Sequence, residues 1–154
     1  LGVRTACTTD RKALAGGLPL EYEQYLNEVV PELSSRHAVS PETVRHLVAF
    51  YGSRADRVLE LARIEPDLKQ AVSPESPDLY AQVLYSVLEE GAKTVSDVIL
   101  RRMHIGITAG RGLAQSDRIA AVIARELKWS TDEKEHWMKE FAGALSRETR
   151  CLSA

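Results

Sequence analysis

Few of the residues that commonly bind metals or act as nucleophiles are arranged in a useful pattern in this chain. None of the four histidines has the H-x-x-x-H or H-E-x-x-H spacing of a zinc site, and they are His37, His46, His104 and His136. The cysteines, Cys7 and Cys151, lie near opposite ends with no metal-ligand spacing around either. No serine lies in a G-x-S-x-G nucleophile elbow. The sequence therefore predicts neither a metal centre nor a catalytic nucleophile.

One charged segment has residue types and spacing that suit a site. Its members are Glu90, Asp97, Arg101 and Arg102, with Glu89 beside them. Asp97 and Arg101 have the i,i+4 spacing of a helical ion pair, worth about 0.3–0.5 kcal/mol when exposed. Arg102 shares a helical face with the apolar Val98 and Ile99, where an unpaired charge would be very unfavourable. We expect Glu90, on the flank of the preceding helix, to be its partner.

Two interpretations of the arginines follow. A guanidinium fork from Arg101 or Arg102 could bind a substrate phosphate through paired hydrogen bonds. Alternatively, Arg102 is held by Glu90 and fixes a corner between two helices. The inward position of Arg102 favours the second interpretation. We therefore expect a structural ion-pair cluster and no catalytic, cofactor-binding or metal-binding residue.

The elements that position this cluster are two short helices. Apolar residues at helical spacing over 80–88 predict the first helix, and Gly91 is suited to the left-handed conformation that follows a helix end. Thr94 and Asp97 have capping-box spacing, which predicts the start of the second helix. We expect the inner face of that helix to carry Val95, Val98, Ile99 and Met103.

The rest of the chain shows the same helical pattern. Apolar stripes predict helices over 20–33, 41–51, 53–63, 113–127 and 131–147, with Pro31 expected to shorten or kink the first. Ser40, Ser53 and Ser130 are expected caps. Residues 64–78 contain three prolines and predict mainly loop, with a turn or two of helix over 67–72, and no segment alternates like a strand. The expected fold is all-α, an orthogonal multi-helix bundle of about seven or eight short helices.

Composition limits the class of protein and its partners. Charged residues make up 27% and hydrophobic residues 44% of 154 residues, which suits one globular domain. The net charge of −2 argues against nucleic acid as a partner. Two cysteines and the lack of an apolar run of about 20 residues indicate a reduced, cytoplasmic protein. Because the chain starts at Leu1, we expect a piece of a longer polypeptide: linker 1–19, helical domain 20–147 and frayed tail 148–154.

The tight connection between the helices over 40–63 also raises a helix-turn-helix interpretation. The second of these helices carries Arg54, Arg57 and Arg63, but it also carries acidic residues that would repel phosphates, namely Asp56, Glu60 and Glu65. A freestanding helical DNA-binding or protein-interaction module built on this pair is the alternative function.

Three ordered motifs resemble one family. The segment from Glu89 to Arg102, E-E-G-A-K-T-V-S-D-V-I-L-R-R, is similar to the C-terminal helical domain of FAD-dependent glycerol-3-phosphate dehydrogenases and glycerophosphate oxidases. The motif H-L-V-x-x-Y-G-S from His46 to Ser53 resembles the same domain, as does E-L-x-W-S from Glu126. The chain departs from the family pattern at Gly91, where a larger residue is usual, and at Met103 and His104, which replace a threonine and a basic residue.

This resemblance implies a parent enzyme that oxidises sn-glycerol 3-phosphate to dihydroxyacetone phosphate with FAD and passes electrons to quinone or oxygen. The flavin-binding and substrate-binding residues would lie N-terminal to this fragment, so none is assigned here. The fragment would be non-catalytic and would pack on the FAD-binding and substrate domain of its own chain. Homodimerisation and peripheral contact with the inner membrane face are further partners that the resemblance leaves open.

Overall fold

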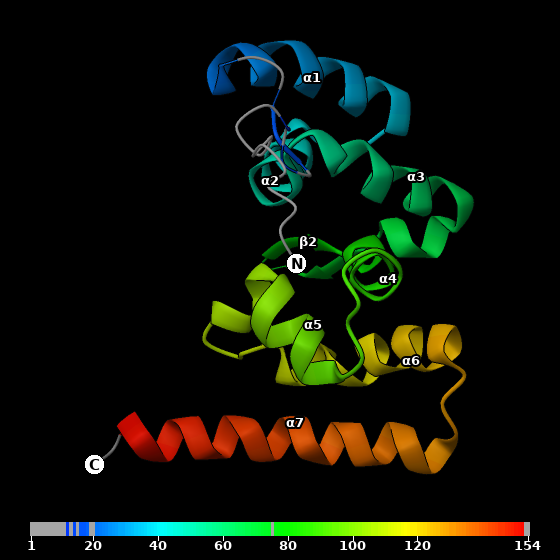
Figure 1. Ribbon diagram of the computed structural model, residues 1–154, viewed down its shortest axis with the longest axis vertical. Coiled ribbons are helices and arrows are strands. Elements are labelled where there is room, and N and C mark those ends of the chain that lie inside the picture. The colour runs from blue at the N-terminus through cyan, green and yellow to red at the C-terminus, as the bar shows by residue number, and fades with distance from the viewer. Residues whose placement is uncertain (1–11, 13, 15, 19–20, 75, 153–154) are drawn as a thin grey trace, which may run out of the picture.

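The computed structural model describes residues 12, 14, 16–18, 21–74 and 76–152 and is built mainly from α-helices. The predicted all-α class is confirmed. In order, the elements are α1 Tyr22–His37, α2 Pro41–Tyr51, η2 Gly52–Arg54, α3 Ala55–Ile64, η3 Pro66–Lys69, β1 Ala71–Ser73, β2 Ser76–Leu79, α4 Tyr80–Leu88, α5 Val95–Arg102, η4 His104–Ile107, η5 Leu113–Gln115, α6 Ser116–Leu127 and α7 Thr131–Leu152. Figure 1 shows them stacked along the long axis, with α1 at one end and α7 at the other.

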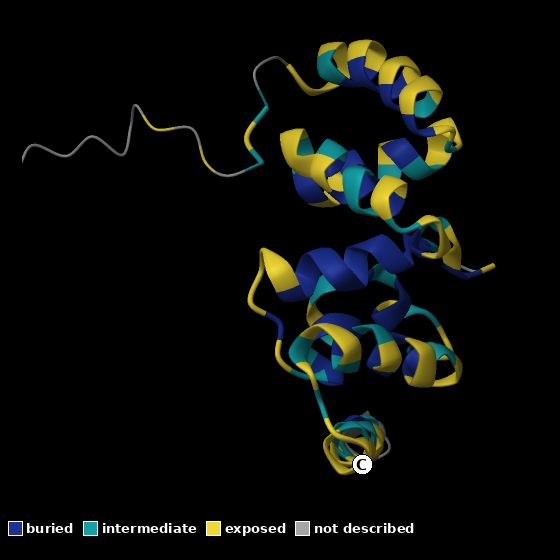
Figure 2. Cartoon of the chain, turned by 90° about the vertical axis from the view of Figure 1, so that its right-hand side faces the viewer, coloured by how far each residue is buried: buried dark blue, intermediate teal, exposed yellow. Residues whose placement is uncertain are grey.

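Helix α4 is the centre of the stack. Every residue from Tyr80 to Val87 is buried, and the helix packs against α3 on one side and α6 on the other. Figure 2 shows it as the continuous dark band in the middle of the molecule. A helix buried on all sides must satisfy its polar residues internally. Ser86 Oγ accordingly donates to the Gln82 carbonyl at 2.8 Å, and Gln82 Oε1 accepts from Leu79 N–H at 2.8 Å.

The predicted helix starts are largely confirmed by hydrogen bonds. Ser40 Oγ accepts from Thr43 N–H at 3.1 Å, Thr94 Oγ1 accepts from Asp97 N–H at 3.0 Å, and Ser130 Oγ accepts from Glu133 N–H at 3.2 Å. Ser53 is different, because it lies inside η2 and caps no helix. Two apolar residues that fall on the stripes predicted over 20–33 and 80–88 are also exposed: Tyr22 at the start of α1 and Leu88 at the end of α4.

Helix α1 continues through Pro31 to His37, beyond its predicted end. Proline removes one backbone hydrogen bond from a helix, but the helix can continue past it when the packing of the next turn stabilises that turn. Leu33 and His37, both buried, supply that packing. The helix ends instead at Ala38, which adopts a left-handed conformation with φ 49°.

The proline-rich segment 64–78 was expected to be mainly loop, and this expectation was wrong for its second half. Strands β1 and β2 form an antiparallel hairpin in which Ala71 pairs with Leu79 and Ser73 pairs with Ser76. Strands this short cannot show a sustained alternation of polar and apolar residues, so periodicity misses them. Burial of Val72 and Leu79 holds the hairpin against the core.

Helix α7 also extends past its predicted end at Arg147, through most of the segment expected to be frayed, and reaches Leu152. Phe141 anchors it in the core, and an ion pair of 2.5 Å joins Arg111 Nη2 to Glu148 Oε2. Residues 153 and 154, like most of the predicted linker 1–19, lie outside the described residues. Across the described part of the chain, every helix is too short or too polar to span a bilayer.

Candidate functional site

The predicted charged cluster forms the corner between α4 and α5. The structure brings Arg102 and Glu90 together, with Nε 3.7 Å from Oε2, and leaves the Arg102 side chain 24% exposed. The guanidinium also donates to two carbonyls, that of Asp97 at 2.9 Å and that of Glu90 at 3.1 Å. Glu90 lies in the turn after α4 rather than on its flank, because the helix ends at Leu88. Arg102 thus ties that turn to the first turn of α5.

Asp97 has two functions at the same corner. Its Oδ2 accepts from the backbone N–H groups of Lys93 and Thr94, both at 3.1 Å, while its Oδ1 pairs with Arg101. Burial raises the pKa of Asp97, but the hydrogen bonds from Lys93 and Thr94 and the charges of Arg101 and Arg102 outweigh it, so the pKa lies below its ordinary value. An ionised carboxylate at a helix start is stabilised by the helix dipole. Arg101 thus binds the Asp97 carboxylate and Arg102 binds two backbone carbonyls, so both arginines already have acceptors within this chain.

A second polar network, which the sequence did not reveal, lies between α2 and η4. Asp78 on β2 is fully buried, and its carboxylate accepts from His46 Nε2 at 2.7 Å, Ser76 Oγ at 2.9 Å and Ile105 N–H at 2.7 Å. Burial raises the pKa of Asp78, and the hydrogen bonds from His46, Ile105 and Ser76 together bring it below the ordinary value. The network joins the hairpin to elements on both sides.

Gln82 and Tyr51 extend this network into α4. Gln82 Nε2 donates to Tyr51 Oη at 3.3 Å and to Asp78 Oδ1 at 3.4 Å. Burial is the main reason that the pKa of Tyr51 is well above its ordinary value. Two polar residues of the H-L-V-x-x-Y-G-S motif, His46 and Tyr51, therefore serve internal packing. In the sequence, Asp78 directly precedes the apolar run that begins at Leu79, and this was the available signal for a buried carboxylate. Because a loop was expected over 64–78, the signal was not recognised.

The outer side of α2 carries a hollow of about 440 Å³ that we call the α2 surface; its main residues are Gly16, Leu18, Tyr22, Phe50, Arg54 and Glu90. Gly16 lies against the end of α2, where its carbonyl accepts from Ser53 N–H at 3.2 Å. A Cβ on Gly52 would lie 1.8 Å from that carbonyl oxygen, so this approach requires glycine. Tyr22 and Phe50 expose 43% and 47% of their surface here.

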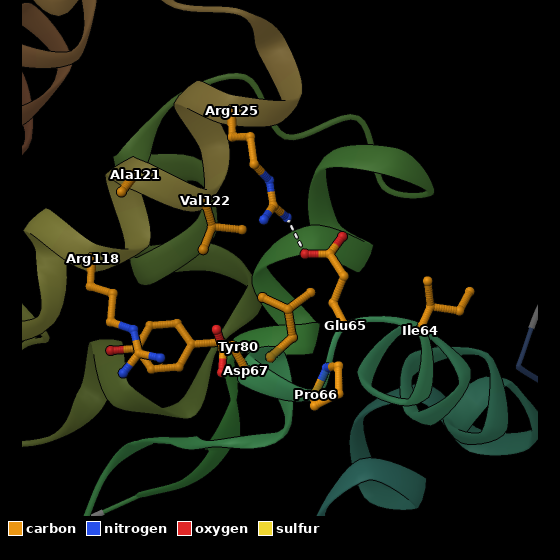
Figure 3. Close-up of a pocket in the computed structure, with 10 residues that line it drawn as sticks. Ile64, Glu65, Pro66, Asp67, Tyr80, Arg118, Ala121, Val122 and Arg125 are labelled. Carbon is orange, nitrogen blue, oxygen red and sulfur yellow. Dashed lines mark ion pairs between the residues drawn. The ribbon is translucent and has the colours of Figure 1, made fainter.

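A larger hollow, of about 660 Å³, lies between the end of α3, η3 and α6 (Figure 3). The Arg118 guanidinium stacks 4.0 Å from the centre of the Tyr80 ring and donates to Gln70 at 2.9 Å. Arg125 pairs with Glu65 at 2.7 Å, as Figure 3 shows. Arg118 and Arg125 are thus both engaged by neighbours within the chain, so neither guanidinium can bind a ligand without breaking an internal contact.

The described residues do not fit a flavin dinucleotide. Such a group is held by a parallel strand, a glycine-rich turn and a helix N-terminus. In the described part of the chain the β-structure is one antiparallel hairpin, and the glycines between Ile105 and Gly112 lie in η4 and the turns after it. No chemistry of such a group is therefore assigned to these residues.

The helix-turn-helix alternative is wrong. Arg57 pairs with Glu89 at 2.7 Å and Arg63 with Glu60 at 2.9 Å, while Arg54 donates to Tyr85 Oη at 3.5 Å. Two of the three arginines on the expected recognition helix are thus paired with carboxylates rather than presented to phosphates. The comparison with known proteins leads to the same conclusion.

The chain is similar to glycerol-3-phosphate dehydrogenases over most of its length. It is 32% identical to the enzyme of Mycobacterium leprae over 113 residues, which is 73% of this chain and 19% of that protein. It is 28% identical to the Synechocystis enzyme over 138 residues, 88% of this chain and 24% of that protein. The mitochondrial enzyme of Arabidopsis thaliana is 29% identical over 75% of this chain and 18% of its own length. The chain thus spans about a fifth to a quarter of these relatives. No solved structure matches it.

The family model for the C-terminal domain of alpha-glycerophosphate oxidase matches residues 7–134, which include every element from α1 to α6 and the start of α7. This match, together with the order of the three motifs, shows the family: the chain belongs to the C-terminal domains of the alpha-glycerophosphate oxidase family.

Proposed function

We propose that this chain is the C-terminal accessory domain of an FAD-dependent glycerol-3-phosphate dehydrogenase, which oxidises sn-glycerol 3-phosphate to dihydroxyacetone phosphate and passes electrons to quinone or oxygen. The observation that carries the proposal is the family match over residues 7–134. We further propose that the domain is not catalytic alone. FAD and the substrate would be held by the larger part of the parent, and this domain would pack on that part.

We infer that the α2 surface is the side that meets the flavoprotein body. Residues 16–18, which precede every helix of the domain in the chain, approach the domain there. Tyr22 and Phe50 leave apolar area uncovered beside it, which is typical of an interface. Arg54 donates to a phenol. The hydrogen bond from Arg57 lowers the pKa of the Glu89 carboxyl and the charge of Arg54 lowers it further, so part of the Arg54 charge is already balanced within the chain.

Supplying this chain to a truncated relative tests the proposal. The Mycobacterium leprae dehydrogenase would be cut before the region that this chain matches, and binding of the two pieces would be measured by calorimetry together with dye reduction by glycerol 3-phosphate. We expect binding and a gain of activity, with no activity from this chain alone. Absence of both would contradict the proposal.

Matched variants then locate the surface. Phe50→Ser removes a side chain that is 47% exposed on the α2 surface, whereas Ile64→Ser removes one that is 69% exposed at the end of α3. We expect only Phe50→Ser to weaken binding, by about tenfold, because a buried aromatic anchor is worth at least 1–2 kcal/mol. Equal binding by both variants would exclude the α2 surface. Homodimerisation of the parent remains a proposal, tested by its mass in solution, and contact with the inner membrane face is a proposal tested by vesicle flotation. A cytoplasmic location is proposed as well.

A further inference from the structure

Three potential metal ligands meet between α1 and α3. His37 is the last residue of α1, and its imidazole is 2% exposed. Asp56 and Glu60 lie one turn apart on the facing side of α3. His37 Nε2 is 2.8 Å from Asp56 Oδ1 and 3.9 Å from Glu60 Oε1, and all three ligand atoms lie within 4.8 Å of one another. Nineteen and twenty-three residues separate the histidine from these acids, so sequence spacing could not reveal the group.

We propose that His37, Asp56 and Glu60 bind a divalent transition-metal ion such as Zn²⁺. Ligand atoms about 2.0–2.1 Å from a tetrahedral ion are roughly 3.4 Å from one another, and the two distances from His37 lie on either side of that value. One imidazole and two carboxylates are suitable ligands for such an ion. Asp56 and Glu60 are 42% and 39% exposed, which leaves a fourth position open to water or to a partner's side chain.

Two hollows border the group: the one that His37 lines, of about 230 Å³, also carries Arg36, Arg63 and Lys69, whereas the one that Asp56 lines is acidic. A hollow of about 310 Å³ beside Asp56 is also lined by Glu28 and Glu32, with Arg36 as the one cation among its lining residues. The phenol of Tyr25 lies in the same hollow. Burial raises the pKa of Tyr25, and the negative charges of Asp56 and Glu32 raise it further.

Two guanidinium groups compete with the ion, and the geometry allows each to yield. Arg63 binds Glu60 through Oε2 at 2.9 Å, so Oε1, the oxygen nearer His37, is free. Arg36 Nη2 lies 2.5 Å from the Asp56 oxygen that faces His37, but its Nη1 is also 3.6 Å from Glu32 Oε1. A bound ion would therefore leave Arg36 with Glu32 as its acidic partner.

The interior side of His37 suits a metal-bound imidazole. Binding through Nε2 places the ring proton on Nδ1, which then needs an acceptor. Among the described residues, His37 Nδ1 and Ser34 Oγ are both buried without a hydrogen-bond partner. They are three residues apart on α1 and hence lie on the same helical face. The two atoms are not hydrogen-bonded to each other in this structure, so Ser34 Oγ would have to turn toward the ring to accept the proton on Nδ1.

Isothermal titration of the whole chain with Zn²⁺ tests the proposal, in a background with both cysteines changed to serine so that thiolates do not bind the probe. We expect one ion per chain. His37→Gln should weaken binding by at least about 10–100-fold, because that is the loss seen when an outer-shell partner of a metal ligand is removed and His37 would be a direct ligand. His136→Gln, at an exposed histidine on α7, is the matched control and should leave binding unchanged.

The most discriminating variant is Arg36→Gln. Removing the competing guanidinium should tighten Zn²⁺ binding severalfold if the ion displaces Arg36 from Asp56, whereas non-specific binding to surface histidines would not respond. Thermal melts of each variant without metal show whether it folds. If His37→Gln does not fold, His37→Asn is used in its place. The proposal would be overturned if the chain with both cysteines changed to serine did not bind Zn²⁺, or if the His37 variants bound it as tightly as that chain.

Discussion

Replacing Asp78 with asparagine tests whether the buried network holds the hairpin, α2 and η4 together. The carboxylate accepts three short hydrogen bonds, from His46, Ser76 and the Ile105 N–H, at 2.7, 2.9 and 2.7 Å. A hydrogen bond to a charged group contributes about 1.5–3 kcal/mol, and a neutral one about 1 kcal/mol. Changing three bonds from charged to neutral should therefore lower the free energy of unfolding by about 3 kcal/mol.

Asparagine is the informative substitution because it keeps the shape of the side chain. Its oxygen can still accept from the Ile105 N–H, while His46 can change tautomer and accept from the new NH₂ group. Asp78→Ala removes all these acceptors and leaves a buried N–H unpaired, so it should cost about 3–5 kcal/mol. The order of the two variants follows from the geometry rather than from burial alone.

Urea unfolding at pH 7, followed by circular dichroism, measures the difference. For a domain of this size, 3 kcal/mol corresponds to a fall of roughly 6–12 °C in the melting temperature. Asp117→Asn is the control, because Asp117 is 80% exposed and its pair with Lys134 at 2.8 Å should contribute at most about 1 kcal/mol. Equal unfolding midpoints for Asp78→Asn and Asp117→Asn would refute the reasoning.

The same network fixes the sign of a pH dependence. The folded-state pKa of Asp78 lies below that of an unfolded aspartate, about 3.9. Its contribution to stability is therefore complete above about pH 3.9 and is lost as the pH falls from there through the folded-state pKa. In acid titrations, the difference in the free energy of unfolding between the unsubstituted chain and Asp78→Asn should shrink only below that pH. A gap that closes between pH 5 and 7 would implicate a different group.

Three further predictions concern the backbone and the corner. Gly91→Ala should lower the free energy of unfolding by about 1–2 kcal/mol from backbone strain alone, because Gly91 has φ 68° and no atom lies within 4 Å of the new Cβ. Gly52→Ala should cost clearly more in the same urea assay, because its Cβ also collides with the Gly16 carbonyl. Arg102→Met should lower the free energy of unfolding by about 1–3 kcal/mol, because it removes hydrogen bonds to the carbonyls of Glu90 and Asp97. Arg101→Met should lower it by about 0.5 kcal/mol or less, because that side chain is 64% exposed. The reverse order would count against a structural role for Arg102. Ser40→Ala should cost about 1 kcal/mol through loss of the α2 cap, and an unchanged melting temperature would show that the cap is dispensable.

Local features of the fold were accessible from the sequence because their causes lie within one turn of helix. Ser40, Thr94 and Ser130 each bond the N–H three residues ahead, a spacing that can be seen in the sequence. The apolar stripes of α2 and α6 likewise follow from helical periodicity. The corner between α4 and α5 was accessible for the same reason, since Asp97 and Arg101 are neighbours on one helix.

Long-range pairings were not accessible in this way. His46 reaches Asp78 across thirty-two residues, and His37 reaches Asp56 across nineteen. Nothing in the spacing of such residues specifies a partner, because the angle between helices and not the helical period decides which side chains meet. The hairpin 71–79 was missed for a related reason, as its strands are too short to show a period and are held by tertiary burial.

The motifs that relate this chain to its family are engaged in holding the domain together. His46 and Tyr51 join the buried network of Asp78 and Gln82, and Gly52 admits the carbonyl of Gly16. Arg102 secures the turn between α4 and α5 through the carbonyl of Glu90. Since these groups already have partners within the chain, a ligand could bind them only by breaking internal bonds. The metal site proposed between α1 and α3 uses His37, Asp56 and Glu60, which lie outside these motifs, and there too Arg36 must leave Asp56 before an ion binds.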